Sequence, residues 1–227
     1  MNKTEKSIFI AALLLGIINL AASIVYILQL PEQIPAHYDI HWICDGYGSR
    51  WMAMLISPLA LIAALFVPLS LKMQKNELNR KPAAIFMLIM SCYCTAINWI
   101  VLYMFGHSHV QLGEKIENPM IGWALPLLFA GLFIAMGNYM PTLRPNSGIG
   151  IRVKWTMENE QVWKLTHRFA GKLWVVIGLL LTAACIAAIL CKAEMGILAL
   201  IVFFEVLVVS VVVPCIYAWK KTTEQTS

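Results

Sequence analysis

Two histidines and an aspartate lie four residues apart in a short polar segment: His37, His41 and Asp45. On a helix this spacing would place the three side chains on one face, and zinc accepts imidazole and carboxylate ligands. Two glycines follow directly and oppose a long helix. Three interpretations therefore stay open: a weak metal site, histidines that only form hydrogen bonds or contact solvent, and recognition of an external ligand with the help of Tyr47.

A longer basic segment, Thr142–Lys172, combines a turn-rich stretch with an amphipathic helix. Gly148 and Gly150 indicate tight backbone geometry, and Thr156 is predicted to be a helix N-cap. From Glu160 onward, charged residues repeat every four positions along one helix face. The residues that we expect to dock a partner or lipid are Arg144, Asn146, Gly148, Gly150, Arg152, Trp155, Thr156, Trp163, Lys164, His167 and Arg168.

Two roles for this basic helix face stay open. The face could lie on anionic lipid headgroups, or it could dock an acidic cytoplasmic protein through Lys164, Arg168 and Lys172. We expect no direct contact with nucleic acid, because phosphate affinity alone does not require this polar pattern on a membrane-tethered loop.

Glu205 is the only acid well inside a long apolar run. An ionisable residue at that depth is costly and is a functional candidate by default. Ser57, Asn98 and Thr182 fall at a similar depth in other apolar runs, so we expect a polar layer around a protonated Glu205. Interhelical hydrogen bonding and proton- or ion-linked transport are the two alternatives for this carboxyl group.

The elements that must position these residues are membrane-spanning helices. Apolar residues make up 60% of the 227-residue chain, and only 13% of residues are charged, whereas a soluble domain is about 25% charged. This composition excludes a soluble enzyme, a disordered chain and an ordinary nucleic-acid-binding domain. Six runs reach the roughly 20 apolar residues that a span needs. They are Ser7–Leu30, Trp51–Leu71, Ala83–Phe105, Ile121–Pro141, Leu173–Cys191 and Ile197–Trp219.

The basic residues segregate between alternate loops. Of the 17 lysines and arginines, only Arg50, Lys115 and Lys192 fall after the first, third and fifth runs. The positive-inside rule therefore places both termini in the cytoplasm. The predicted fold is an all-α integral membrane protein with six transmembrane helices and an amphipathic cytoplasmic helix before the fifth span. Residues 1–82 would form a two-span module with the histidine-rich outer loop, and residues 83–227 a four-span module with the basic loop.

Two motifs in these loops resemble motifs of the SdpI family, membrane immunity proteins against the sporulation-delaying toxin peptide. The outer motif comprises Pro31, Ile34, Pro35, His37 and Asp45, followed by Tyr47-Gly48-Ser49. The inner motif runs from Asn138 through Lys172, with RPNSGIGIR, then WT, then Trp163, His167, Arg168 and Gly171. The resemblance implies immunity to a membrane-active peptide and, as in the founding member, capture of a small ArsR-type repressor at the membrane.

The resulting hypothesis is a multi-pass protein of the bacterial plasma membrane that confers immunity, with no catalysis and no cofactor. Its expected partners are the lipid bilayer, a peptide toxin on the outer face and a cytoplasmic repressor protein. Two rival functions stay open. One is a small proton- or ion-linked secondary transporter that uses Glu205, and the other is an outer-face metal-dependent membrane enzyme built on His37, His41 and Asp45.

Overall fold

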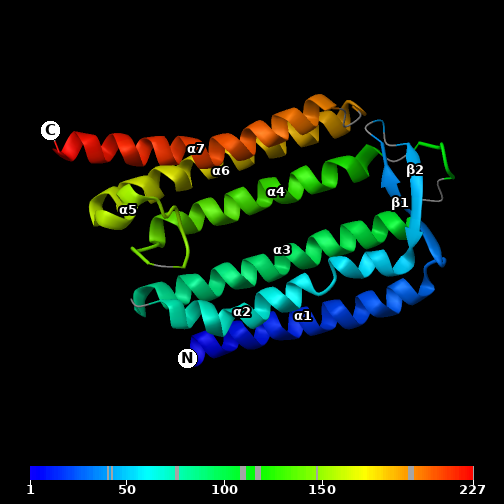
Figure 1. The fold of residues 1–227 in the computed structure, drawn as a ribbon, viewed down its shortest axis with the longest axis horizontal. Coiled ribbons are helices and arrows are strands. Elements are labelled where there is room, and N and C mark those ends of the chain that lie inside the picture. Colours follow the sequence, from blue (N-terminus) through cyan, green and yellow to red (C-terminus); the bar gives the residue numbers. More distant parts are fainter. Residues whose placement is uncertain are drawn as a thin grey trace.

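The structure is a computed structural model that describes residues 1–39, 41, 43–74, 77–107, 111–115, 119–146, 148–193 and 197–226. For residues 119–122, 125, 197–203, 205 and 225–226 it describes the backbone alone. Long helices run alongside one another, and a two-stranded hairpin lies at one end of the bundle, which we call the hairpin end (Figure 1). Both termini lie at the opposite end, called the loop end (Figure 1). The chain is mostly helical as predicted, but the hairpin departs from an all-α fold.

Five helical segments of the described residues are long and apolar enough to cross a membrane. They are α1 (Lys3–Gln29), Arg50–Met73, Glu77–His107, α6 (Glu160–Leu190) and Val206–Glu224 of α7 (Ile197–Thr226). The remaining predicted span corresponds to α4 (Pro119–Tyr139), in which several side chains lie outside the described part. Large apolar side chains are exposed along these helices, including Ile18 at 63% and Leu180 at 66%. Such a surface suits lipid rather than water.

The first three long helices share two buried apolar clusters. α2 (Leu59–Met73) follows the 3-10 helix η1 (Arg50–Leu55), and α3 (Arg80–His107) follows η2 (Glu77–Asn79). The cluster toward the loop end comprises Ala12, Ala64, Val67, Leu71 and Ala84. The cluster toward the hairpin end comprises Ile27, Leu30, Ile34, Ala53 and Leu102. Packing thus groups α3 with α1 and α2, and the module boundary between residues 82 and 83 stays a prediction.

The second predicted span is interrupted rather than continuous. The chain runs as η1, turns at residues 56–58 and resumes as α2, in part because Pro58 has no N–H to donate. Asn19 of α1 covers this break, since its Nδ2 donates to the carbonyl oxygen of Ser57 at 3.0 Å. A backbone acceptor that would otherwise face hydrocarbon is thereby satisfied.

Helices α4 and α6 approach until their backbones touch. A Cβ atom added to Gly171 would lie 2.6 Å from the carbonyl oxygen of Gly137, and one added to Gly178 would lie 2.7 Å from that of Ala130. Interfaces between membrane helices commonly use small residues in this way. Helix α7 packs on α6, with the rings of Phe169 and Tyr217 stacked 4.3 Å apart. The 3-10 helix η3 (Met140–Thr142) and α5 (Lys154–Glu158) complete the described elements at the loop end.

Candidate functional site

The outer motif folds as a β-hairpin and not as a helix. β1 (Gln33–Tyr38) pairs antiparallel with β2 (Cys44–Ser49), and the register is irregular around His37. The helical face considered for His37, His41 and Asp45 is therefore wrong. Proline and glycine in this segment disfavour a helix, and the strand backbones hydrogen-bond to each other instead.

Three contacts attach the hairpin and the residue that follows it to the rest of the molecule. Ile34 of β1 is 1% exposed and packs among α1, η1 and α3. The Nη1 atom of Arg50 donates to the carbonyl oxygen of Leu30 at 3.1 Å, just beyond the last turn of α1, where unpaired carbonyls favour a cation. On the other side of β2, the N–H of Gly113 donates to the carbonyl oxygen of Cys44 at 2.8 Å. The hairpin is thus tied to the segments before and after it.

The exposed face of the hairpin carries a contact between His37 and Asp45. Nδ1 of His37 lies 2.5 Å from Oδ1 of Asp45, and these side chains are 74% and 46% exposed. Tyr47 is 42% exposed and pairs with Pro35, whereas Asp45 lies at an irregularity of the register, so strand alternation does not place Tyr47 beside the His37–Asp45 pair. The hairpin thus presents an imidazole–carboxylate pair and, separately, an exposed aromatic ring to a molecule outside the bundle.

His41 lies in the turn between the strands, apart from this face. Its backbone N–H donates to Oδ1 of Asp39 at 2.8 Å, and so does the N–H of Ile43. The bond from Ile43 holds the pKa of the Asp39 carboxyl below its ordinary value. No group of three potential metal ligands lies together among the residues that the structure describes. Sequence analysis missed Asp39, although an aspartate before a turn is a typical signal of side-chain to backbone bonding.

At the loop end, residues 143–146 and 148–153 are irregular, and we call the segment from 143 to 153 the glycine-rich loop. Asn146 is 9% exposed and organises this loop. Its Oδ1 accepts from the N–H groups of Gly148 at 2.8 Å and Ile149 at 2.7 Å. Its Nδ2 donates to the carbonyl oxygen of Arg144 at 2.8 Å. One buried amide therefore bonds to the backbone on both sides of position 147, which lies outside the described residues.

Asn79 reaches this loop from the first helix group. It is 1% exposed, and its Oδ1 accepts from the N–H of Arg144 while its Nδ2 donates to the carbonyl oxygen of the same residue, both at 3.0 Å. The side-chain amide of Asn79 thus bonds to both the N–H and the C=O of Arg144, as the backbone of a neighbouring strand would. Sequence analysis missed Asn79, because nothing local links two residues 65 positions apart.

Trp163 and His167 of α6 form the buried floor beneath the glycine-rich loop. Both are 0% exposed, and their rings stack with centroids 4.0 Å apart. Nε1 of Trp163 donates to the carbonyl oxygen of Leu143 at 2.9 Å. Nε2 of His167 accepts from the N–H of Ile151 at 3.0 Å. Gly150 has a φ of +118°, and an added Cβ would lie well inside van der Waals contact of Nε2 of His167.

His167 is held as a neutral imidazole with its proton on Nδ1. That nitrogen lies 2.9 Å from the carbonyl oxygen of Trp163 and donates to it, so Nε2 is left as an acceptor. Burial lowers the pKa of His167 from 6.5 to about 4, although the bond to Trp163 acts in the opposite direction. The fifth predicted apolar run begins only at Leu173, and the exposed Arg168 and Lys172 lie between His167 and that run.

Thr156 is not the N-cap of the long helix, contrary to the prediction. It lies inside α5, where its Oγ1 accepts from the N–H of Val153 and donates to the carbonyl oxygen of Ile151 at 2.7 Å. Asn159 caps α6 instead, with its Oδ1 accepting from two N–H groups of the first turn. Threonine and asparagine are both favourable N-caps, so composition could not separate the two positions.

The charged members of the predicted docking set are exposed. They are Arg144, Arg152, Lys164 and Arg168. Trp155 is half-buried beside them. The predicted set thus divides into residues that build the loop, such as Asn146 and Trp163, and residues that the loop and α6 present to the outside.

Asn98 is buried as predicted and bonds to Ser57, a predicted member of the polar layer, but its other partners come from α1. Nδ2 of Asn98 donates to Oδ1 of Asn19 at 3.2 Å and to Oγ of Ser23 at 2.8 Å, and Oγ of Ser57 donates to its Oδ1 at 2.8 Å. Thr182 instead donates to a carbonyl oxygen of its own helix. The backbone of Glu205 lies in α7, and its side chain is outside the described part.

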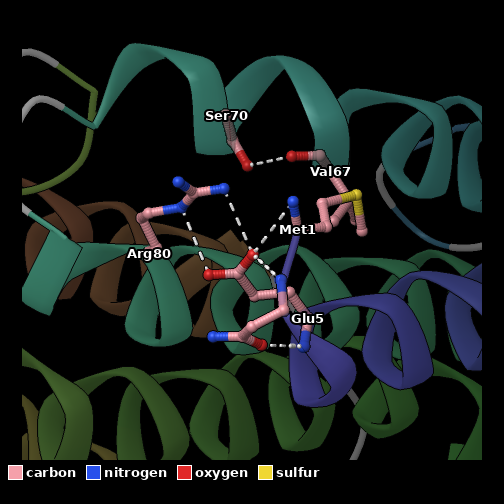
Figure 2. Close-up of polar contacts among 6 residues, drawn as sticks. Met1, Glu5, Val67, Ser70 and Arg80 are labelled. Atoms are coloured by element: carbon pink, nitrogen blue, oxygen red, sulfur yellow. Dashed lines mark hydrogen bonds and ion pairs between the residues drawn. The ribbon is translucent and has the colours of Figure 1, made fainter.

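A buried ion pair at the loop end also escaped sequence analysis. The Glu5 side chain is 4% exposed, and its Oε1 lies 3.2 Å from Nε of Arg80. Figure 2 shows the carboxylate between Arg80 and the terminal amine of Met1, which lies 3.8 Å from Oε2. Asn2 and Glu5 also form a capping box at the start of α1. Their Asn-x-x-Glu spacing was the signal in the sequence.

The apolar helices, the exposed lipid-facing side chains and the two structured ends define an integral membrane protein with several membrane-spanning helices. The chain is 30% identical over 188 residues to "Immunity protein SdpI" of Bacillus subtilis (strain 168), with 80% of each chain covered. It belongs to the SdpI family, as the resemblance of its motifs implied. The SdpI/YfhL protein family matches residues 142–218, and a domain of unknown function, DUF1648, matches residues 14–62. No solved structure matches the chain.

Proposed function

We propose that this protein confers immunity to a secreted, membrane-active peptide and catalyses no reaction. The name of the Bacillus subtilis relative supports immunity. The observation that supports the proposal is the exposed face of the hairpin with its His37–Asp45 pair, on a hairpin packed against three helices. A peptide approaching from outside would meet this face first.

The proposed topology has six spans in the bacterial plasma membrane, with both termini in the cytoplasm. Both termini and the glycine-rich loop lie at one end of the bundle, and the hairpin lies at the other (Figure 1). The basic residues concentrate at the loop end, as the positive-inside rule requires of a cytoplasmic face. In intact cells, an impermeant thiol reagent should label a cysteine placed at Ser49 and not one at Asn159. Labelling of the Asn159 probe would rule out this topology.

Survival of a sensitive strain in the sporulation-delaying toxin peptide tests the immunity proposal. Cells that express His37→Ala or Asp45→Ala should lose resistance, because each substitution removes one member of the exposed pair. Gln111→Ala is the matched control, since Gln111 is exposed in the loop that pairs with β2. Full resistance of both variants at matched expression would contradict recognition by this face.

A second proposed role is capture of an acidic cytoplasmic protein, such as an ArsR-type repressor, by the exposed basic face of α6. Charge complementarity speeds docking and sets specificity. Lys164→Glu combined with Arg168→Glu should reduce membrane recruitment of a tagged repressor while sparing more of the resistance. Lys3→Glu combined with Lys6→Glu makes the same charge change elsewhere at the loop end. If the hairpin and α6 variants lose both readouts equally while folded, the two roles are not separable.

A further inference from the structure

Two cavities between the helix groups join into one groove. The first has a volume of about 460 Å³ and lies beside the glycine-rich loop, where Gly148 and Arg152 line it. The second has a volume of about 320 Å³ and extends deeper between the helices. The cavities share five lining residues, from α3, α4, α6 and α7. These are Phe86, Met136, Trp174, Ser210 and Val211.

The deep part of the groove accepts only an apolar occupant. Apart from Trp174 and Ser210, its lining side chains are all hydrocarbon or thioether. The two polar side chains are already satisfied: Nε1 of Trp174 donates to the carbonyl oxygen of Ser210 at 2.8 Å, and Oγ of Ser210 donates to that of Leu207 at 2.7 Å. A peptide backbone placed there would leave its own N–H and C=O groups unpaired, at a cost of several kcal/mol for each.

The groove opens toward the bilayer and ends at a basic mouth. Val211 on its wall is 60% exposed, and in a spanning helix that exposure is to lipid. At the loop end the exposed Arg152 lines the mouth. The stretch from residue 142 to residue 157 contains three basic residues and no acid. Basic pockets between membrane helices on the cytoplasmic side are typical binding sites for anionic lipid headgroups.

We propose that this groove binds one anionic phospholipid of the cytoplasmic leaflet. An acyl chain fills the space between Phe86 and Val211, and the phosphate pairs with Arg152. The site is distinct from the exposed faces assigned to the toxin and to the cytoplasmic partner. It would make the shape of the glycine-rich loop depend on lipid, because the headgroup contacts the same loop that Asn146 and His167 hold.

Quenching of Trp174 by brominated lipid tests this proposal. The full-length protein is placed in phosphatidylcholine vesicles that contain increasing fractions of brominated phosphatidylglycerol or brominated phosphatidylcholine. The difference between the wild type and Trp174→Phe isolates the signal of this one indole. We expect half-saturation with phosphatidylglycerol at a mole fraction about fivefold lower, which corresponds to the roughly 1 kcal/mol that one basic residue contributes near anionic lipid. Equal half-saturation for the two lipids would overturn the proposal.

Two matched pairs of variants locate the headgroup and the acyl chain. Arg152→Gln should abolish the fivefold preference, whereas Arg144→Gln should keep it, because Arg144 is exposed in the same loop but does not line the groove. Val211→Phe should reduce the amplitude of quenching with either lipid, whereas Val212→Phe on the next position should not. An unchanged preference in Arg152→Gln, or an unchanged amplitude in folded Val211→Phe, would overturn the site. If Val211→Phe fails to fold, the arginine pair decides alone, and neither readout depends on immunity.

Discussion

The hairpin and the glycine-rich loop use their motif residues in opposite ways. At the hairpin end His37, Asp45 and Tyr47 are exposed, and the fold relies on strand pairing and on the buried Ile34. At the loop end Asn146 and His167 are buried, and each bonds to backbone groups of the loop. The outer motif thus exposes its polar side chains on a hairpin that other residues hold in place. The inner motif instead uses its own side chains to hold the loop in place.

Because of this difference, we expect the motif residues at the two ends to affect different properties of the protein. Substitution of a buried motif residue at the loop end should cost stability first and function as a consequence. Substitution on the exposed hairpin face should cost function at nearly constant stability. At the loop end, the charged residues between the motif positions, such as Arg152 and Arg168, are the exposed ones. Three sets of substitutions and one change of pH test this contrast.

The largest effect is expected from Gly150→Ala. The substitution places a side chain at a φ of +118° and forces a Cβ against His167. Strain at such a backbone conformation costs about 1–3 kcal/mol, and overpacking adds about 1–3 kcal/mol. Thermal unfolding in detergent should therefore show a loss of about 2–6 kcal/mol.

Gly113→Ala at the hairpin end is the matched control for this prediction. Gly113 also has a positive φ, of +86°, but a Cβ there would meet nothing within 4 Å. Only backbone strain remains, at about 1 kcal/mol. Equal destabilisation by the two substitutions would show that the packing beneath the glycine-rich loop is not the cause.

The second effect concerns the buried ion pair between Glu5 and Arg80. Arg80→Met leaves Glu5 buried without its guanidinium (Figure 2), and removing one partner of a buried pair typically costs about 3–5 kcal/mol. Because the Arg80 side chain is 30% exposed, we expect about 2–4 kcal/mol by denaturant unfolding at neutral pH. The double variant Arg80→Met with Glu5→Leu should recover part of the loss. No recovery would mean that the charge of Glu5 is not the source of the instability.

The third effect is a pH dependence at the loop end. The pKa of His167 falls from 6.5 to about 4 on folding, so between these values the unfolded state binds a proton that the folded state does not. Stability should be constant above pH 6.5 and should decrease as the pH falls toward 4. The total loss is about 3 kcal/mol. His167→Gln should be less stable at pH 7 but should lack this component of the melting profile, and an identical profile would contradict the assignment.

The smallest effect on stability is expected on the exposed hairpin face. His37→Ala and Tyr47→Ala should each change the free energy of unfolding by no more than about 0.5 kcal/mol, because exposed pairs and rings contribute little. The same variants should reduce survival in the toxin peptide. Melting temperatures are measured on the purified variants, and survival is measured on the cells that express them. A large stability loss without a change in survival would reverse the contrast between the two ends.

The helices could be predicted from sequence because apolar runs of about 20 residues leave few alternatives. The predicted run Ala83–Phe105 lies within α3, and α6 extends beyond its predicted run by the amphipathic segment before Leu173. The hairpin was not predicted, because its strands are only six residues long and the histidine spacing imitates a helix. Short strands are decided by pairing, which no local pattern records.

Burial of Asn98 and its nearness to Ser57 could be predicted from depth in the apolar runs, but its contacts with α1 could not. Depth fixes a position along the helix axis and leaves the rotation of each helix open. The layer therefore forms with Asn19 and Ser23 of α1. The contacts of Asn79 with Arg144, and of Arg80 with Glu5, join residues 65 and 75 positions apart. Such pairings follow from tertiary packing alone.

Helix α3 has a mechanical consequence for the whole molecule. Asn79, just before its first residue, forms two hydrogen bonds with the backbone of the glycine-rich loop. Leu102, near the far end of α3, packs in the cluster that contains Ile34. A helix of 28 residues is a stiff rod of about 42 Å. One continuous helix therefore links the glycine-rich loop to the cluster behind the hairpin, so a substitution that shortens or tilts α3 should disturb the packing at both ends of the molecule.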